Sequence, residues 1–232
     1  MSTVQGARAR ARVEVTAAIK DEARRQLAAD GAAKLSLRAV ARELGMVSSA
    51  LYRYFPSRDE LLTALIVDAY DAVGEAAEDA LAKQRTAASP TARWIAVCRA
   101  VRAWALAHPH EYALIYGSPV PGYTAPETTN VPASRVGLVL ISIARDAHLG
   151  KGVAPPKPPA RLLVDGERMA AEFAPDLPPA VVVALVAAWA QLFGLISFEA
   201  FGQFHRVVEE RDAFFAQAAE QLARSVGLVL PA

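Results

Sequence analysis

The sequence predicts an all-α fold, in which a small helical unit at the N-terminus precedes a larger helical body. Hydrophobic residues make up 53% of the 232 positions, and charged residues are spaced among alanines and leucines with a helical period. Alternating runs of Val, Thr and Tyr, which would indicate strands, are nearly absent. A chain of this length can bury a substantial core in one large domain, or in a small domain fused to a larger one.

The net charge of +1 conceals an uneven distribution. Residues 1–60 contain eleven basic and seven acidic side chains, a net charge of +4, which leaves −3 on the remainder. A basic head favours contact with a polyanion, although an imbalance of this size also arises by chance. The single Cys98 excludes a disulfide framework and a cysteine-built zinc site. No secretory signal is recognisable, so we expect a cytoplasmic protein without metal or cofactor.

The first two elements are a basic arm and a helix. Residues 1–12 are polar, with an arginine at every second position from residue 8, and predict a flexible basic arm. From Val13 to Asp30, apolar side chains recur at every fourth position, which predicts an amphipathic helix. Gly31 is suited to end that helix, because glycine readily adopts the left-handed conformation found there.

A helix, a turn and a second helix follow over residues 36–55. Ser36 is suited to cap a short helix over residues 37–44, and Gly45 is suited to end it. A second short helix is expected from about Ser48 to Phe55, before Pro56. Two short helices that cross steeply need a small residue at the crossing, which Ala41 supplies, and a turn residue tolerant of positive φ, which Gly45 supplies.

The second short helix would present a polar outward face. Val40, Leu44, Met46 and Leu51 fall where the shared core should be, so the face left outside carries two hydroxyls, a phenol and a guanidinium. Such groups suit base edges and phosphate oxygens in a major groove. The outward residues are Ser48, Ser49, Tyr52 and Arg53. An Ala-x-x-x-Gly pair alone is common in helical hairpins, but the whole arrangement in register predicts a helix-turn-helix.

A long helix connects this head to the rest of the chain. Ser57-Arg58-Asp59-Glu60 has the pattern of a capping box, and the helix that it opens extends to about Gln84. We therefore expect a helix-turn-helix DNA-binding domain over residues 13–60 and a larger helical dimerisation and ligand-binding domain over residues 61–232. Helices in the second domain are expected over residues 91–107, 109–116, 133–148, 160–173, 179–202 and 207–226.

The run from Ser36 to Leu61 resembles the DNA-binding domain of the tetracycline-repressor (TetR) family, above all in Leu51-Tyr52-x-Tyr54-Phe55 followed by Ser57-Arg58-x-x-Leu61. Val47 departs from the Ser or Thr frequent there. The resemblance implies phosphate contacts by Tyr52, Tyr54 and the Ser36 helix end, with Arg58 adding charge at a helix N-terminus. It makes Arg38, Ser48, Ser49 and Arg53 the candidates for reading bases. Arg8, Arg10 and Arg12 would lie along the DNA backbone or in a minor groove.

A second, scattered resemblance lies further along the chain. Trp104-x-x-x-His108-Pro109, with Tyr112, Tyr116 and Gly117, is similar to the regulatory domain of a TetR subgroup known for Trp, His and Gly positions. Trp189, Gly194 and Glu199-x-Phe201-Gly202 are similar to a later helix of that group. His108 and Pro109 also fit an ordinary helix end, so we interpret His108 as structural.

Aromatic residues of the second domain are candidates for an effector pocket, which would lie between helices and be mostly apolar. They are Trp104, Tyr112, Tyr116, Trp189 and Phe193. Taken one at a time, each is better explained as core, whereas a pocket bordered by some of them is still expected. The uncharged stretch Leu177–Phe198 is long enough to span a bilayer, but its alanines, Gln191, Ser197 and acidic flanks favour a buried helix. Residues 179–202 and 207–226 are the predicted homodimer interface, a four-helix bundle.

Together these patterns predict a transcriptional regulator that binds a double-stranded DNA operator as a homodimer. By resemblance it would be a repressor, and a small apolar effector would release it. We find no constellation of catalytic residues, and His108 and His110 point to different faces of any helix. Two alternatives stay open: a DNA-binding or scaffold protein without sequence preference, and an all-α enzyme.

Overall fold

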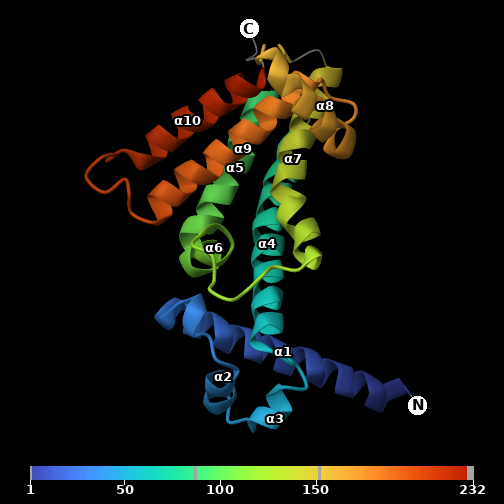
Figure 1. The fold of residues 1–232 in the computed structure, drawn as a ribbon, viewed down its shortest axis with the longest axis vertical. Coiled ribbons are helices and arrows are strands. Elements are labelled where there is room, and N and C mark those ends of the chain that lie inside the picture. Colours follow the sequence, from blue (N-terminus) through green and yellow to red (C-terminus); the bar gives the residue numbers. More distant parts are fainter. Residues whose placement is uncertain (1, 86–87, 151–152, 229–232) are drawn as a thin grey trace. The chain divides into compact units, whose positions relative to one another are not determined.

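The computed structural model describes residues 2–85, 88–150 and 153–228, with side chains from residue 6. Over these residues the chain forms ten α-helices, two short 3₁₀ helices and no strand, which confirms the all-α prediction (Figure 1). The α-helices are α1 (Ser2–Asp30), α2 (Leu37–Glu43), α3 (Ser48–Leu51), α4 (Arg58–Ala82), α5 (Pro90–Ala107), α6 (Pro109–Tyr116), α7 (Asn130–Leu149), α8 (Ala160–Phe173), α9 (Pro179–Ala200) and α10 (Arg211–Val226). The 3₁₀ helices are η1 (Ala32–Lys34) and η2 (Glu127–Thr129).

The helices group into two compact units. The first, here called the head, comprises residues 1–70 and 108–130, and the second, the body, comprises residues 71–107 and 131–232. The helix α4 starts in the head and ends in the body, whereas α6 and the segment after it belong to the head. The functional boundaries expected after residues 12 and 60, which separate the arm, the DNA-binding domain and the second domain, remain predictions.

The head is organised around the apolar face of α1. Ile19, Ala23 and Leu27 are buried there, and they pack with buried side chains of α2, α3 and the start of α4. The segment after α6 completes this core, because Val120 and Tyr123 pack against it. Leu114 of α6 does the same.

Polar contacts fix α1 and the segment after α6 to α4 within the head. Lys20 and Arg24 each donate to Asp68 at 2.7 Å, and Arg24 also lies 3.9 Å from Glu111 of α6. The hydroxyls of Thr63 and Tyr123 are hydrogen-bonded at 2.8 Å. The segment of residues 117–129, between α6 and α7, therefore has a defined structural role.

The body is built on contacts of α9 with α5, α8 and α10. Its core contains large buried side chains from α5, α7, α9 and α10, among others. Arg102 of α5 connects three of these helices: it makes a bidentate pair with Glu199 of α9, at 2.6 and 2.7 Å, and donates to Asp212 of α10 at 2.7 Å. The largest fully buried side chains of the body include Trp94, Leu140, Ile143, Leu192 and Ile196.

The helix α9 is long and apolar enough to cross a membrane by length and composition alone. In the structure it is a central helix of the body instead. Val181, Leu185, Ala188, Leu192 and Ile196 recur at three- and four-residue spacing and are buried against neighbouring helices. The interpretation of residues 177–198 as a buried helix holds for this face, whereas Val186, Trp189 and Phe198 are exposed.

Three helix limits differ from the sequence prediction by four or more residues. The first helix begins at Ser2 rather than Val13, because Ala and Arg, strong helix formers, fill residues 7–12. Met1 lies outside the described residues. The last helix begins at Arg211 rather than Val207, since residues 201–207 form turns in which Gly202 and Arg206 have positive φ. The second helix of the helix-turn-helix is shorter than expected.

Candidate nucleic-acid interface and pocket

The first helix of the helix-turn-helix, α2, has the cap and the turn that its sequence requires. The Ser36 hydroxyl accepts a hydrogen bond from the backbone N–H of Ala39 at 3.4 Å. After the helix, Gly45 adopts a φ of +64°, and the Met46 N–H donates to the Ala41 carbonyl at 2.8 Å. A side chain at residue 45 would strain this turn, so Gly45 sets the angle between α2 and α3.

The second helix, α3, is a single turn. Val47 is its N-cap residue and gives no side-chain cap, which agrees with its departure from the family pattern. Residues 52–54 continue as turns, in which the N–H groups of Tyr54 and Phe55 both donate to the Leu51 carbonyl. Leu51 and Phe55 are buried and anchor the segment, so the residues between them are displayed outward.

The predicted contact residues fall into two groups by exposure. Arg38, Ser49, Tyr52 and Arg53 are exposed, and Tyr52 keeps 40% of its surface in solvent. Ser36, Ser48, Tyr54 and Arg58 are partly buried. Ser49, Tyr52 and Arg53 therefore form a compact polar face on α3 and the turn after it. Whether these side chains touch DNA stays a prediction.

The Arg58 guanidinium has partners within the head. It donates to the carbonyls of Leu35 at 3.2 Å and Ala32 at 2.9 Å, and so connects the start of α4 to the segment between α1 and α2. Beside it, the Ser57 hydroxyl caps α4 by accepting from the Glu60 N–H at 3.1 Å. A resemblance between sequences cannot reveal such bonds, because they join residues more than twenty positions apart.

One contact links the predicted basic arm to the recognition segment. The Arg12 guanidinium lies 5.1 Å from the centre of the Tyr54 ring, in a cation–π arrangement. The arginines at residues 8, 10 and 12 lie on α1, so the helix fixes the spacing between them. The predicted flexible arm over residues 1–12, separate from the helix, does not include this contact.

The five residues expected to line an effector pocket do not form one group. Tyr112 and Tyr116 belong to the head, where their ring centres lie 5.2 Å apart and Tyr116 packs edge-on against Tyr70 at 6.0 Å. Burial raises the pKa of the Tyr70 and Tyr116 hydroxyls. Trp104 and Phe193 belong to the body and are buried, Phe193 with its ring centre 5.7 Å from that of Trp189.

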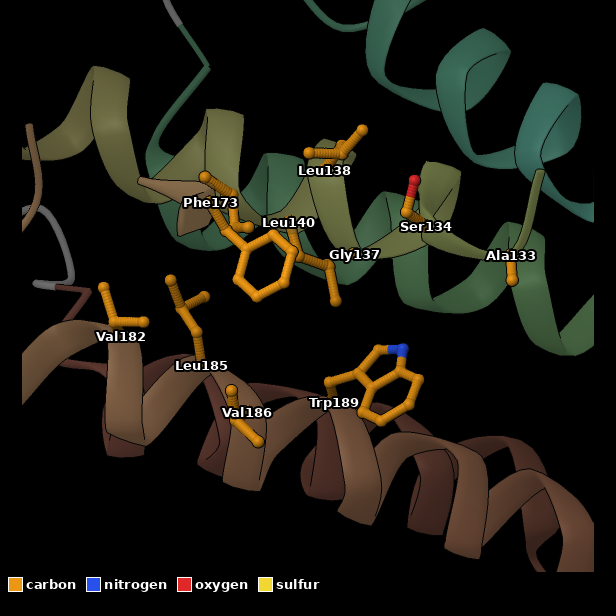
Figure 2. A pocket seen from close by; sticks show the side chains of 11 residues that line it. Ala133, Ser134, Gly137, Leu138, Leu140, Phe173, Val182, Leu185, Val186 and Trp189 are labelled. Atoms are coloured by element: carbon orange, nitrogen blue, oxygen red, sulfur yellow. The ribbon is translucent and has the colours of Figure 1, made fainter. Parts of the chain in front are cut away.

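Trp189 lines a pocket of about 230 Å³ between α7, α8 and α9. Figure 2 shows side chains of α7 and α9 facing each other across it, with the Phe173 ring of α8 beside them. Its walls are mostly aliphatic, from residues such as Leu138, Leu140, Leu185 and Val186. The sequence predicts an aromatic lining, and of that set only Trp189 is present; a signal for this pocket is Gly137, a glycine within a helix.

Comparisons with known proteins agree with this architecture. Residues 19–65 match the family described as bacterial regulatory proteins of the tetR family, and residues 94–222 match the tetracyclin repressor-like C-terminal domain. HTH-type transcriptional regulators from Mycobacterium tuberculosis and Mycobacterium bovis are each 45% identical over 210 residues, 86% of either chain. The crystal structure of the regulatory protein SCO4313 is 33% identical, with a TM-score of 0.78 over 92% of this chain and 97% of its own.

The chain belongs to the TetR family.

This TetR-family protein is a transcriptional regulator with an N-terminal DNA-binding helix-turn-helix. The second match covers residues 94–222, which include Trp104 and Glu199 of the body and His108 of the head, positions on which the subgroup resemblance depends. Within the described parts of the chain, no cluster of three or more His, Cys, Asp or Glu side chains could hold a metal ion.

Proposed function

We propose that this TetR-family regulator binds a specific operator as a homodimer, represses transcription in the cytoplasm, and is released by a small apolar effector. The observation that carries the proposal is the exposed polar face of Ser49, Tyr52 and Arg53 on a capped helix-turn-helix. A short helix with such a face fits the major groove, where each base pair presents a distinct pattern of donors and acceptors.

The contact residues would divide their roles by chemistry and exposure. Arg38, Ser48, Ser49 and Arg53 would contact base edges, while Ser36, Tyr52 and Tyr54 would bind phosphates. Arg58 would act mainly by positioning the segment before α2 through its two backbone acceptors, although its charge also lies at the N-terminus of α4. Arg12, stacked on Tyr54, would add a sequence-independent phosphate contact.

The homodimer would form through α9 and α10. A groove between these helices is lined by Gly194, Leu195 and three phenylalanines, of which Phe198 and Phe214 are 54% and 42% exposed. At Gly194 an added Cβ would have no neighbour within 4 Å, so a partner helix could approach closely there. Leu192 is fully buried within the protomer, so Leu195 and Phe198 are the suitable positions for testing the interface.

Release by an effector would be a population shift between two conformations of the dimer. The effector would bind one conformation better and the operator the other. The continuous helix α4, shared by head and body, supports a mechanical connection between the two events.

The test measures binding to a duplex selected from a random-sequence library, with an unrelated duplex for comparison. Arg53→Ala should weaken binding to the selected duplex by about 5- to 150-fold, equivalent to about 1–3 kcal/mol for a lost bidentate base contact. It should weaken binding to the unrelated duplex much less. Tyr52→Phe should weaken both by a similar, smaller factor, because a lost phosphate contact carries no sequence information.

Arg168→Ala is the matched control, since Arg168 is an exposed arginine on α8 of the body and its loss changes the net charge equally. Its affinity for both duplexes should equal that of the wild type. Equal losses on both duplexes for Arg53→Ala would indicate a DNA-binding protein without sequence preference. Unchanged binding for both Arg53→Ala and Tyr52→Phe would refute the docking face.

A further inference from the structure

The pocket between α7, α8 and α9 has an unusually uniform lining. Its eleven lining residues include no charged side chain, and only Ser134 and Trp189 carry a polar side-chain atom. Figure 2 shows Ser134 and Gly137 on one wall, with Val186 and Trp189 on the other. A charge buried in this cavity would be disfavoured, because no group on its walls would replace the lost hydration.

Two glycines build the pocket. A Cβ added at Gly137 of α7 would have no neighbour within 4 Å, so this position leaves open space where other residues would place a side chain. At Gly166 of α8, a Cβ would lie 2.9 Å from the Pro179 carbonyl oxygen and 2.9 Å from Val183, so glycine there lets α8 pack closely on α9. That packing fixes the end of α8, where Phe173 lines the pocket.

The mouth of the pocket is an exposed apolar patch. Leu138, Phe173, Val186 and Trp189 keep between 38% and 50% of their surfaces in solvent. Clustered exposure of large apolar side chains around a concave site is typical of ligand binding.

A second copy of the chain is a poor occupant, because the proposed dimer groove uses another side of α9. With about 3.6 residues per turn, Val182, Val186 and Trp189 project on the side opposite to Gly194 and Phe198. The volume favours a small molecule as well. A cavity of about 150 Å³ holds one benzene ring, so about 230 Å³ suits two fused rings.

We propose that this pocket is the effector site, and that its ligand is an uncharged, hydrocarbon-rich molecule of about two fused rings with at most one hydrogen-bonding group. This inference rests on the proposed function. It specifies where the effector binds and what kind of molecule releases the regulator from DNA. Trp189 is the single residue that it shares with the aromatic set expected from the sequence.

Arg135 of α7 connects the pocket wall to α4. In the sequence it lies between Ser134 and Gly137, which line the pocket. Its guanidinium donates to Asp71 at 2.8 Å, and to the two oxygens of Glu78 at 2.8 and 2.7 Å. The side chain crosses α4 at Gly74, where a Cβ would come within 2.7 Å of it. A displacement of α7 by ligand would therefore act on α4, which continues into the head.

The first experiment measures ligand binding without DNA. The probe is 1-fluoronaphthalene, whose fluorine NMR signal broadens on binding, and 4-fluoro-1-naphthoate serves as a charged analogue. Wild type should bind the neutral probe at least tenfold more tightly than the naphthoate. Gly137→Leu should abolish binding of the neutral probe, because its side chain fills the pocket. Leucine is also a better helix former than glycine, so the fold should persist.

Two further variants keep the result interpretable. Gly137→Ala, which adds one methyl group, should weaken binding by several-fold even if the leucine variant folds poorly. Val131→Leu, on an exposed position of α7 outside the pocket, should bind the probe like the wild type. Undiminished binding to both Gly137 variants would overturn the site, and equal or tighter binding of the naphthoate would overturn the ligand class.

The second experiment measures release from the selected duplex. Saturating 1-fluoronaphthalene should lower wild-type affinity for DNA by at least fivefold, a coupling within the usual allosteric range. Arg135→Gln should bind the probe within twofold of the wild type but show little release. Lys83→Gln, which removes another cation near the end of the α4 helix, should be released normally. Probe bound in the pocket without any effect on DNA would overturn the effector assignment, whereas failure to select any duplex would instead count against the proposed function.

Discussion

The Arg102–Glu199 pair provides a quantitative test of how α5, α9 and α10 are held together in the body. Arg102 is 13% exposed and Glu199 6% exposed at their side chains, and the Arg102 guanidinium also lies 5.0 Å from the centre of the Phe215 ring of α10. The hydrogen bonds that Arg102 donates to Glu199 and Asp212 raise its pKa, so it stays charged. Replacing it with methionine leaves a buried carboxylate without its partner. Such a change costs about 3 kcal/mol of unfolding free energy.

The reverse replacement should cost less. In Glu199→Met, Arg102 keeps Asp212 and can extend towards water, so we expect a loss of about 2 kcal/mol. The double variant should also lose only about 2 kcal/mol, because two methionines refill the volume without leaving a charge, which makes the coupling about 3 kcal/mol. Asp212→Ala should lose less than about 0.5 kcal/mol, since Asp212 is 93% exposed.

The assay is urea unfolding at pH 7, followed by far-UV circular dichroism at one fixed protomer concentration, because dimerisation would make stability depend on concentration. Strict additivity, in which the double variant loses the sum of the two single losses, would refute the reasoning. A larger loss for Asp212→Ala than for Arg102→Met would refute it as well.

Three further predictions concern a thiol, an ion pair and the dimer. Burial raises the pKa of the Cys98 thiol and shields it, so an aromatic disulfide reagent should label native protein only at the rate of unfolding; rapid labelling of folded protein would contradict this. The hydrogen bond from Arg135 lowers the pKa of Glu78 from 4.5, so this pair stabilises the fold above about pH 4.5 and the contribution is lost as the pH falls through the lowered value. The stability of Glu78→Gln should accordingly fall less steeply below pH 4.5, and identical acid unfolding curves would disprove the linkage. Phe198→Asp should sediment as a monomer, whereas Leu149→Asp, at an equally apolar and 76% exposed site, should remain dimeric; a dimeric Phe198→Asp protein would remove α9 from the interface.

The helix-turn-helix was predictable because its determinants are local. Ser36, Ala41, Gly45 and Pro56 act on the backbone within a few residues of themselves, so their order in the sequence nearly defines the geometry. The buried anchors Leu51 and Phe55 follow from the helical period. The ends of the helices were harder to predict, since Ala and Arg at residues 7–12 are compatible with a helix as well as with a flexible arm.

The pocket and the makeup of the head were not predictable in the same way. Whether an aliphatic residue such as Leu138 or Val186 faces a packed core or an open space depends on helices distant in sequence, and both cases give the same pattern. Val120 and Tyr123 join the core of the head from a loop after α6, through contacts with residues some sixty or more positions earlier. Arg58 illustrates the same limit, because its backbone acceptors lie far from it along the chain.

The central claim is that a dimer of this protein reads a specific operator through the face formed by Ser49, Tyr52 and Arg53. The most direct measurement is selection from a random-sequence duplex library followed by sequencing of the bound fraction. Two such faces in one symmetric dimer should select an inverted repeat whose half-sites are centred about one helical turn apart, roughly 34–36 Å, bound by two protomers. Enrichment of no sequence, or of a single half-site bound by one protomer, would contradict it.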